Sequence, residues 1–109
     1  SRYNSIAFLD MNFSIQEDLD QVESTIDKYF ENHWREEEVL VEQPAILGVQ
    51  DIQQGEATIR IMLTAQPMEH FGAARRTRKR LKQYLESQGV FVSVPTMDIS
   101  DFDQTDAEV

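Results

Sequence analysis

The sequence predicts a single α+β domain. Three observations support it: alternating apolar residues in three segments, apolar residues at three- and four-residue steps in two others, and the order β-α-β-β-α-β. This order is typical of the ferredoxin-like fold, in which two helices lie on one face of a four-stranded antiparallel sheet. We expect the domain to span residues 1–95, followed by a short strand and an acidic tail over residues 96–109.

The first segment predicts a half-buried strand. Apolar side chains occupy alternate positions over residues 7–13, namely Ala7, Leu9, Met11 and Phe13. Because Ile6 and Phe8 are apolar as well, we expect the other face of this strand to meet further atoms near its start.

A helix is predicted next, reaching about Trp34. Ser14 and Glu17 have the spacing of a capping box, and the acidic residues that follow suit the positive end of a helix. The predicted apolar stripe consists of Leu19, Val22, Ile26, Tyr29, Phe30 and His33.

Two strands joined by a short turn follow. The first covers residues 45–52 and contains Gly48, which indicates a bulge. Residues 53–56 form the turn, and in residues 57–65 every second side chain is apolar, from Ala57 to Ala65, with Met62 the one apolar residue between them. The uncovered face of the sheet is then expected to carry Asp10, Asn12, Thr58, Arg60 and Thr64.

The second helix is predicted to have Pro67 in its first turn and Gly89 just after its last. The alternating valines of residues 90–94 predict a last strand, which Pro95 stops. The side of this helix that we expect to be buried carries Phe71, Ala74, Thr77, Leu81 and Leu85.

Composition excludes several classes of function. The chain has no cysteine, which rules out disulfides, thiolate metal sites and a cysteine nucleophile. Its net charge of −10 disfavours nucleic acid and anionic lipid as partners of the whole surface. No apolar run approaches the roughly 18–20 residues that would span a bilayer. The sequence also lacks a nucleophile elbow, a P-loop and a dinucleotide-binding glycine pattern, so we expect no enzymatic activity.

Neither histidine predicts a metal site. His33 belongs to the apolar stripe, and His70 lies next to Glu69 with no third ligand in view. The acidic residues 36–38 and 17–20 lack the alternating oxygen ligands of a calcium loop. We therefore expect no catalytic residue, no metal and no cofactor.

A basic cluster on the second helix is the strongest candidate surface. Six of the ten basic residues lie between Arg75 and Lys82. Most of them fall opposite the buried side of the helix, with Arg78 near its edge. A solvated or subunit-bridging face is the favoured interpretation, with RNA binding as the alternative. The candidate subunit-contact or charged surface consists of Arg75, Arg76, Lys79, Arg80 and Lys82.

Several segments together resemble the C-terminal α/β domain of the small-conductance mechanosensitive channel family. The acidic helix start "EDLDQVESTID", the link and strand "VLVEQPAILGVQDI" and the strand "GEATIRIMLTAQP" are similar to that family in order and spacing. The longest match is "FGAARRTRKRLKQYLESQGVFVSVP", an Arg-rich helix that ends at a glycine before a strand and a proline. The resemblance covers residues 6–95.

The resemblance implies a structural role. In this family seven subunits form a tension-gated pore, and their cytoplasmic parts enclose a vestibule with side openings. It implies that the partners are other copies of the chain in a homoheptamer, with no nucleic acid. It also implies contact with the membrane through transmembrane helices and a middle β-domain preceding Ser1, and a location at the cytoplasmic face.

Alternatives remain at this stage. The same topology would suit a free-standing regulatory or ligand-binding module or, with less support, an RNA-binding domain. For a channel, the acidic residues of the segment 101–108 could bias the ions in the vestibule toward cations, or they could serve solubility alone. We expect the isolated chain to be a monomer or a weak dimer.

Overall fold

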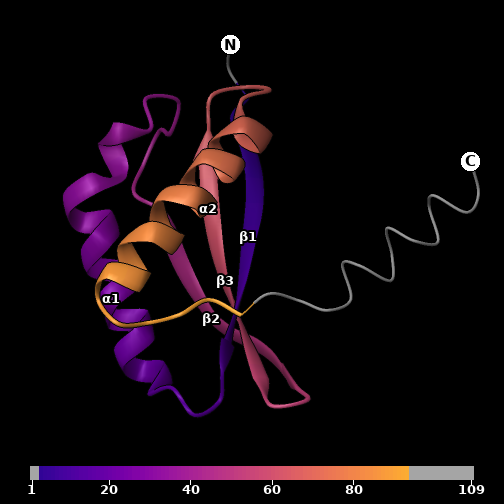
Figure 1. Cartoon of the computed structure of the whole chain (residues 1–109). Coiled ribbons are helices and arrows are strands. Elements are labelled where there is room, and N and C mark those ends of the chain that lie inside the picture. Colours follow the sequence, from indigo (N-terminus) through magenta and orange to yellow (C-terminus); the bar gives the residue numbers. More distant parts are fainter. Residues whose placement is uncertain (1–2, 94–109) are drawn as a thin grey trace, which may run out of the picture.

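The computed structural model describes residues 3–93, which form an antiparallel sheet and two helices (Figure 1). Within these residues the sheet has three strands in the order β1-β3-β2, so β3 pairs with both of its neighbours. The α+β class and the predicted order of the first five elements are therefore confirmed. In chain order the elements are β1 (Ser5–Ser14), α1 (Leu19–His33), the 3-10 turn η1 (Trp34–Glu36), β2 (Ala45–Gln53), β3 (Glu56–Ala65) and α2 (His70–Ser87).

The core lies between the sheet and the two helices. Alternate residues of β1 and β3 point into it, and the register places Leu9 opposite Ile61. Both of these side chains are fully buried, as are Ile26 of α1 and Leu81 of α2. Because directly opposite residues in an antiparallel pair share a face, the remaining residues of β1 and β3 lie on the uncovered face of the sheet.

The start of α1 differs from the capping box that the sequence predicts. The N-cap is Asp18, whose carboxylate accepts a hydrogen bond from the backbone N–H of Gln21 at 3.2 Å. Ser14 instead ends β1, and its hydroxyl accepts from the N–H of Gln16 at 3.1 Å. Both oxygens satisfy free backbone donors, but Asp18 lies directly before the first helical residue and Ser14 does not.

The hairpin of β2 and β3 follows the prediction. The register shifts between Ile46 and Gly48, which is the expected bulge, and Gly48 has a φ of 100°. The turn has Gln54 and Gly55 at φ values of 53° and 80°. Two consecutive left-handed residues suit the right-handed twist of a two-residue hairpin turn.

Helix α2 begins later than predicted and buries a different residue near its start. Pro67 lies before the helix and not in its first turn, because α2 begins at His70. Phe71 was expected in the core but is 66% exposed, whereas Ala73 is fully buried. The buried residues follow an unbroken four-residue step, Ala73, Thr77, Leu81 and Leu85.

The end of α2 confirms the role of Gly89. This glycine has a φ of 86°, a conformation that costs other residues more. The N–H of Gly89 donates to the carbonyl of Glu86, and that of Val90 donates to Leu85. These two bonds form a Schellman motif.

A fourth strand is not confirmed. Residues 90–93 are not part of the sheet ladder, although the N–H of Ser93 donates to the carbonyl of Asn12 in β1 at 2.8 Å. Val94, the domain boundary at residue 95, the short strand at residues 97–99 and the acidic tail lie outside the described residues.

Candidate functional site

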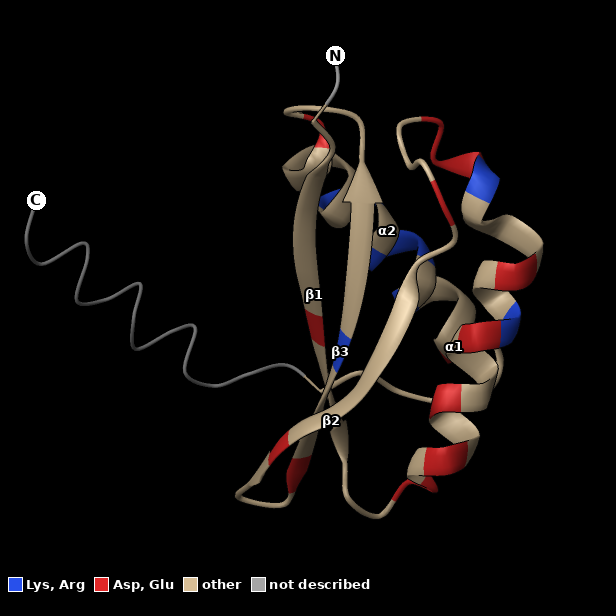
Figure 2. Ribbon diagram, turned by 180° about the vertical axis from the view of Figure 1, so that it is seen from behind, with Lys and Arg blue, Asp and Glu red and all other residues tan. Residues whose placement is uncertain are grey.

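The basic residues of α2 form two groups with different neighbours. Figure 2 shows Lys and Arg concentrated on α2, while most of α1's charged residues are acidic. Arg76 and Arg80 face the loop after η1, and Arg75 and Arg78 lie beside β1. Lys82 forms an i,i+4 ion pair with Glu86 at 2.8 Å. The predicted cluster is therefore divided among several neighbours within the described residues.

Glu37 forms ion pairs with two residues of the predicted charged surface, Arg76 and Arg80. Its side chain is 8% exposed, and its oxygens lie 2.6 Å from Arg76 Nη2 and 3.0 Å from Arg80 Nη1. Arg76 also donates from Nε, so its guanidinium binds the carboxylate through two nitrogen atoms. The hydrogen bonds to Glu37 raise the pKa of the Arg76 guanidinium above its ordinary value. We call these three residues the Glu37 clamp.

The clamp joins segments that are far apart in the sequence. Glu37 follows η1, and its carbonyl accepts a hydrogen bond from the N–H of Leu40. Leu40 forms an isolated bridge with Ala65 at the end of β3. The clamp thus fixes this loop against both α2 and the sheet, which is a structural role that the spacing of basic residues along α2 did not reveal.

A groove lies beside the start of β1, along the edge away from β3. Its volume is about 450 Å³, and we call it the edge groove. Three of its apolar side chains are largely exposed: Ile6 at 52%, Phe8 at 54% and Phe71 at 66%. Its polar lining comes from α2, with His70, Arg75 and Arg78.

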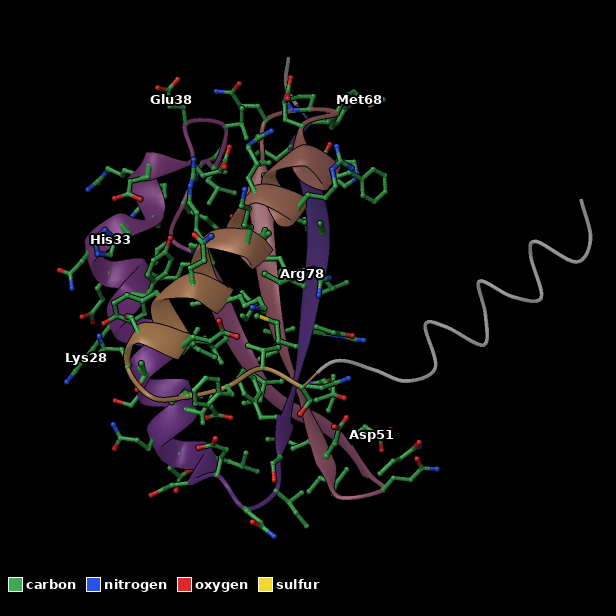
Figure 3. All side chains as sticks on the ribbon, viewed as in Figure 1. Lys28, His33, Glu38, Asp51, Met68 and Arg78 are labelled. Carbon is green, nitrogen blue, oxygen red and sulfur yellow. The ribbon has the colours of Figure 1, made fainter. Side chains whose placement is uncertain are left out.

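Arg78 connects α2 to the backbone of β1. Its guanidinium Nη1 donates to the carbonyl of Asp10 at 3.0 Å. Figure 3 shows Arg78 extending from α2 over β1. The sequence placed Arg78 at the margin of the basic face, and its reach across to β1 explains why it is not part of the Glu37 clamp.

The uncovered face of the sheet carries two hydrogen-bonded pairs of polar side chains and an exposed aromatic ring. Arg60 holds Asp10 through two hydrogen bonds of 2.9 and 3.0 Å, and Thr58 donates to Asn12 at 2.6 Å. The hydrogen bonds to Asp10, and then the negative charge of Asp10, raise the pKa of Arg60. The residues predicted for this face are therefore present there.

Phe8 lies on this face as well, as its position between the core residues Ala7 and Leu9 predicts. It lies in register with Met62, and the guanidinium of Arg60 sits 5.1 Å from the centre of its ring. The signal was present in the sequence, because Phe8 interrupts the alternation of β1 on the side that the helices leave uncovered.

Aromatic rings gather where α1 meets α2. The ring of Tyr29 lies 5.0 Å from His33 and 5.1 Å from Tyr84, and His33 Nδ1 lies 2.8 Å from a carboxylate oxygen of Glu36. Burial, and then the nearby charge of Glu36, raise the pKa of the Tyr29 phenol. His33 is thus positioned by one carboxylate and two rings.

His70 is in a different position, at the first residue of α2. Its ring lies 4.1 Å from the ring of Phe71, and its Nδ1 is buried without a hydrogen-bond partner among residues 3–93. Those residues contain no group of three His, Cys, Asp or Glu side chains that could hold a metal ion. Within the same range, neither helix combines the length and apolar character that a membrane crossing requires.

Comparison with known proteins bears on the predicted resemblance. No family model matches the chain. A small-conductance mechanosensitive channel from Caldanaerobacter subterraneus subsp. tengcongensis is 26% identical to it over 90 residues. The chain is similar to a mechanosensitive channel. The resemblance that the sequence predicts is therefore confirmed.

The matched region covers most of this chain but a much smaller part of the channel. It includes 83% of this chain but 32% of the channel. The chain thus spans about a third of the length of the channel that it matches, as one domain of a larger protein would.

Proposed function

We propose that this chain is a cytoplasmic vestibule domain of a tension-gated channel, assembled with other copies of itself below the pore. The observation that carries the proposal is the 90-residue similarity to a small-conductance mechanosensitive channel, of which it covers 32%. Membrane-spanning segments elsewhere in the parent protein would supply the pore. The described residues would supply a rigid wall element, and the predicted strand over residues 90–94 would complete a ferredoxin-like sheet as its fourth strand.

The ion-paired carboxylates of Glu37 and Asp10 support a structural role without catalysis. Glu37 is held by Arg76 and Arg80, and Asp10 is held by Arg60. A carboxylate held in this way is a poor general base, since its lone pairs are already engaged. We propose that the domain contributes to subunit assembly and to the passage of solutes, without chemistry of its own.

The test is a patch-clamp recording of the full reading frame that encodes this chain, expressed in cells that lack mechanosensitive channels. We expect currents that appear when membrane tension rises. A matched variant carries Ile61→Asp, which places a charge in the core of this domain and should abolish or alter the currents. A reading frame without membrane-spanning segments would contradict the proposal and favour a free-standing regulatory module.

Ion filtering by the acidic segment is a separate part of the proposal. Residues 101–108 include Asp101, Asp103, Asp106 and Glu108, and several copies around one chamber would attract cations. Neutralising these four residues should then shift the relative permeability of the open channel toward anions. The shift should shrink as the salt concentration rises, because the charges are screened. Unchanged selectivity would show that the segment serves solubility alone.

RNA binding has less support. Phe8 offers one ring for stacking on the uncovered face, but its neighbour Arg60 is paired with Asp10. Arg76 and Arg80 are likewise paired with Glu37, whose single negative charge offsets half of their combined positive charge. A titration with single-stranded RNA at two salt concentrations distinguishes the two functions, since phosphate contacts weaken steeply with salt.

A further inference from the structure

We propose that copies of this chain contact one another head to tail, with the basic outer side of α2 on one copy against the acidic outer side of α1 on the next. The partner of each surface is thus a second copy of the chain. The inference rests on the proposed function, in which copies assemble, and it names the two surfaces through which they would meet.

The basic surface lies beside the edge of β1 that faces away from β3. Four residues of α2 share this side of the helix because they recur at steps of three and four, and we call them the α2 flank: Phe71, Arg75, Arg78 and Lys82. The first three line the edge groove, together with Ile6 and Phe8, which are 52% and 54% exposed. Neither Arg75 nor Arg78 forms an ion pair with a carboxylate of residues 3–93. The α2 flank therefore combines uncompensated positive charge with exposed apolar surface.

The acidic surface lies on the side of α1 that faces β2. Four acidic residues recur there at steps of three and four, and we call them the α1 flank: Asp20, Glu23, Asp27 and Glu31. Glu23 shows which side of the helix this is, because a Cβ atom on Gly48 of β2 would lie 3.8 Å from its carboxylate. Within residues 3–93 none of the four carboxylates forms an ion pair. The negative charge of this flank is therefore uncompensated as well.

Exposed apolar residues also lie beside the α1 flank. Val49 of β2 is opposite Ile59, which is fully buried, so Val49 is on the face of the sheet that the helices cover. Ile52 is on the same face, opposite the buried Ala57. Val49 and Ile52 are nevertheless 38% and 57% exposed. Each flank thus has apolar surface to bury and charge of the opposite sign to offer the other.

The two flanks lie on opposite sides of the domain. The strand order β1-β3-β2 puts β1 and β2 at the two edges of the described sheet, and α2 packs on β1 and β3 while α1 packs on β2 (Figure 1). The hydrogen bond from Ser93 to Asn12 is near the end of β1, so the predicted strand over residues 90–94 would leave the start of β1 to a partner.

Charge decides how two copies would meet. A flank that met the same flank of another copy would bring like charges together, which is unfavourable. The α2 flank of one copy and the α1 flank of the next bring opposite charges together. Contacts of this head-to-tail kind repeat from copy to copy, and they close into a ring where the rotation between copies allows it.

Carbodiimide cross-linking tests the contact in the full chain of 109 residues. The reagent joins a lysine amine to a carboxylate that touches it and so traps weak complexes. A mixture of unlabelled and isotope-labelled chain distinguishes links between copies from links within one copy. We expect Lys82 to be joined to the α1 flank of another copy at least about threefold more often than Lys28 is. Lys28 is the internal control, because it is exposed on α1 but lies outside both flanks.

Reversing the charge of one flank separates this contact from the effect of net charge. Asp27→Lys and Glu31→Lys each raise the net charge by 2, so the double variant changes it from −10 to −6. Weaker overall repulsion would by itself raise the yield of cross-linked dimer, whereas the proposal predicts a fall of at least about threefold. The matched control is Glu38→Lys with Glu42→Lys, which has the same net charge and the same numbers of lysines and carboxylates. Both of its positions are exposed and lie outside the flanks, so its yield should not fall.

A reversal of the other flank should restore the contact in a mixture. Arg75→Glu with Lys82→Glu should lower the yield when this variant is alone. Mixed with the Asp27→Lys, Glu31→Lys variant, it should give cross-linked dimers again, because the two reversed flanks carry opposite charges. Recovery on mixing would also show that both variants are folded.

Two results would overturn the proposal: links from Lys82 that are no more frequent than links from Lys28, or no recovery when the two reversed variants are mixed. The channel recording is a separate measurement. Currents without these cross-links would leave the proposed function standing and reject the contact. Cross-links without currents would establish the contact and reject the channel.

Discussion

Glu37 is buried, yet both of its positively charged partners come from a helix about forty residues later. The two oxygens accept hydrogen bonds from Arg76 and Arg80 at distances of 2.6 to 3.0 Å. Since the arginine side chains are 48% and 40% exposed, water can solvate them if the carboxylate is removed. The principal loss would then be the hydrogen bonds and the attachment of the loop to α2.

Replacing Glu37 by Ala should destabilise the domain. We expect the free energy of unfolding to fall by about 1.5–3 kcal/mol, the range for hydrogen bonds to charged groups. Glu38→Ala is the matched control, because Glu38 is exposed, and it should change the value by less than about 0.5 kcal/mol. Urea denaturation of both variants measures the difference, and equal midpoints would contradict the role of the clamp.

Ionisation of the Tyr29 phenol makes the free energy of unfolding depend on pH in the alkaline range. Burial raises the pKa of its phenol above the ordinary value of about 10 that it regains in the unfolded chain. The folded protein therefore favours the neutral phenol. Its contribution to stability is fully present below pH about 10 and is lost as the pH rises through the folded-state pKa.

Tyr29→Phe should consequently weaken the alkaline loss of stability. Between pH about 9 and 11 the decline in the free energy of unfolding should be shallower in the variant than in the natural chain, because phenylalanine cannot ionise. Denaturant titrations across this range provide the measurement. Parallel curves for the two proteins would show that Tyr29 does not contribute.

At the scale of the element, α2 packs against two neighbouring strands of the sheet, β1 and β3. Its buried side follows the four-residue step from Ala73 to Leu85 and contacts β1 and β3. Its other sides carry Arg78 to β1 and Arg76 to the loop after η1. One side of the helix thus packs in the core, and two other sides form hydrogen bonds to β1 and to the loop after η1. Phe71 lies outside the core.

Two substitutions in α2 test whether the helix buries the side that the structure shows or the side that the sequence predicted. Leu81→Ala removes a fully buried side chain and should lower the free energy of unfolding by about 2–5 kcal/mol. Phe71→Ala removes a larger side chain that is 66% exposed, and should cost less than about 1 kcal/mol. Thermal or urea unfolding would measure both. A larger loss for Phe71→Ala than for Leu81→Ala would place Phe71 in the core after all.

At the scale of the whole molecule, charge and apolar surface are unevenly distributed. The net charge is −10, yet the basic residues concentrate on α2 (Figure 2). The exposed apolar residues near the start of β1 include Ile6 and Phe8. Repulsion between like-charged copies opposes self-association, whereas the exposed apolar residues favour it.

We expect the isolated chain to be a monomer or a weak dimer, because most contacts that hold a channel ring would lie in other parts of the parent protein. Light scattering over a range of protein concentrations measures the mass. If dimers form, higher salt should favour them by screening the repulsion. A stable seven-fold species would contradict this expectation and show that the domain assembles by itself.

Local patterns were sufficient for most of the backbone. Strict alternation identified β3, Gly48 marked the bulge, and Gly89 marked the end of α2, because each depends on residues close in the chain. The resemblance to mechanosensitive channels was also visible in the sequence and was confirmed by a relative 26% identical over 90 residues.

Tertiary structure decided the candidate surface. Contacts between residues about forty positions apart, such as Arg76 with Glu37, give two residues of the predicted basic face an acidic partner and are invisible to a helical projection. The same projection could not distinguish Phe71 from Ala73, since both lie near the edge of the apolar stripe and only the position of α2 on the sheet selects between them. By itself the sequence determined the first five elements and the family likeness, because these are properties of short segments in order. Which charges remain free for a partner was settled only when those segments packed together.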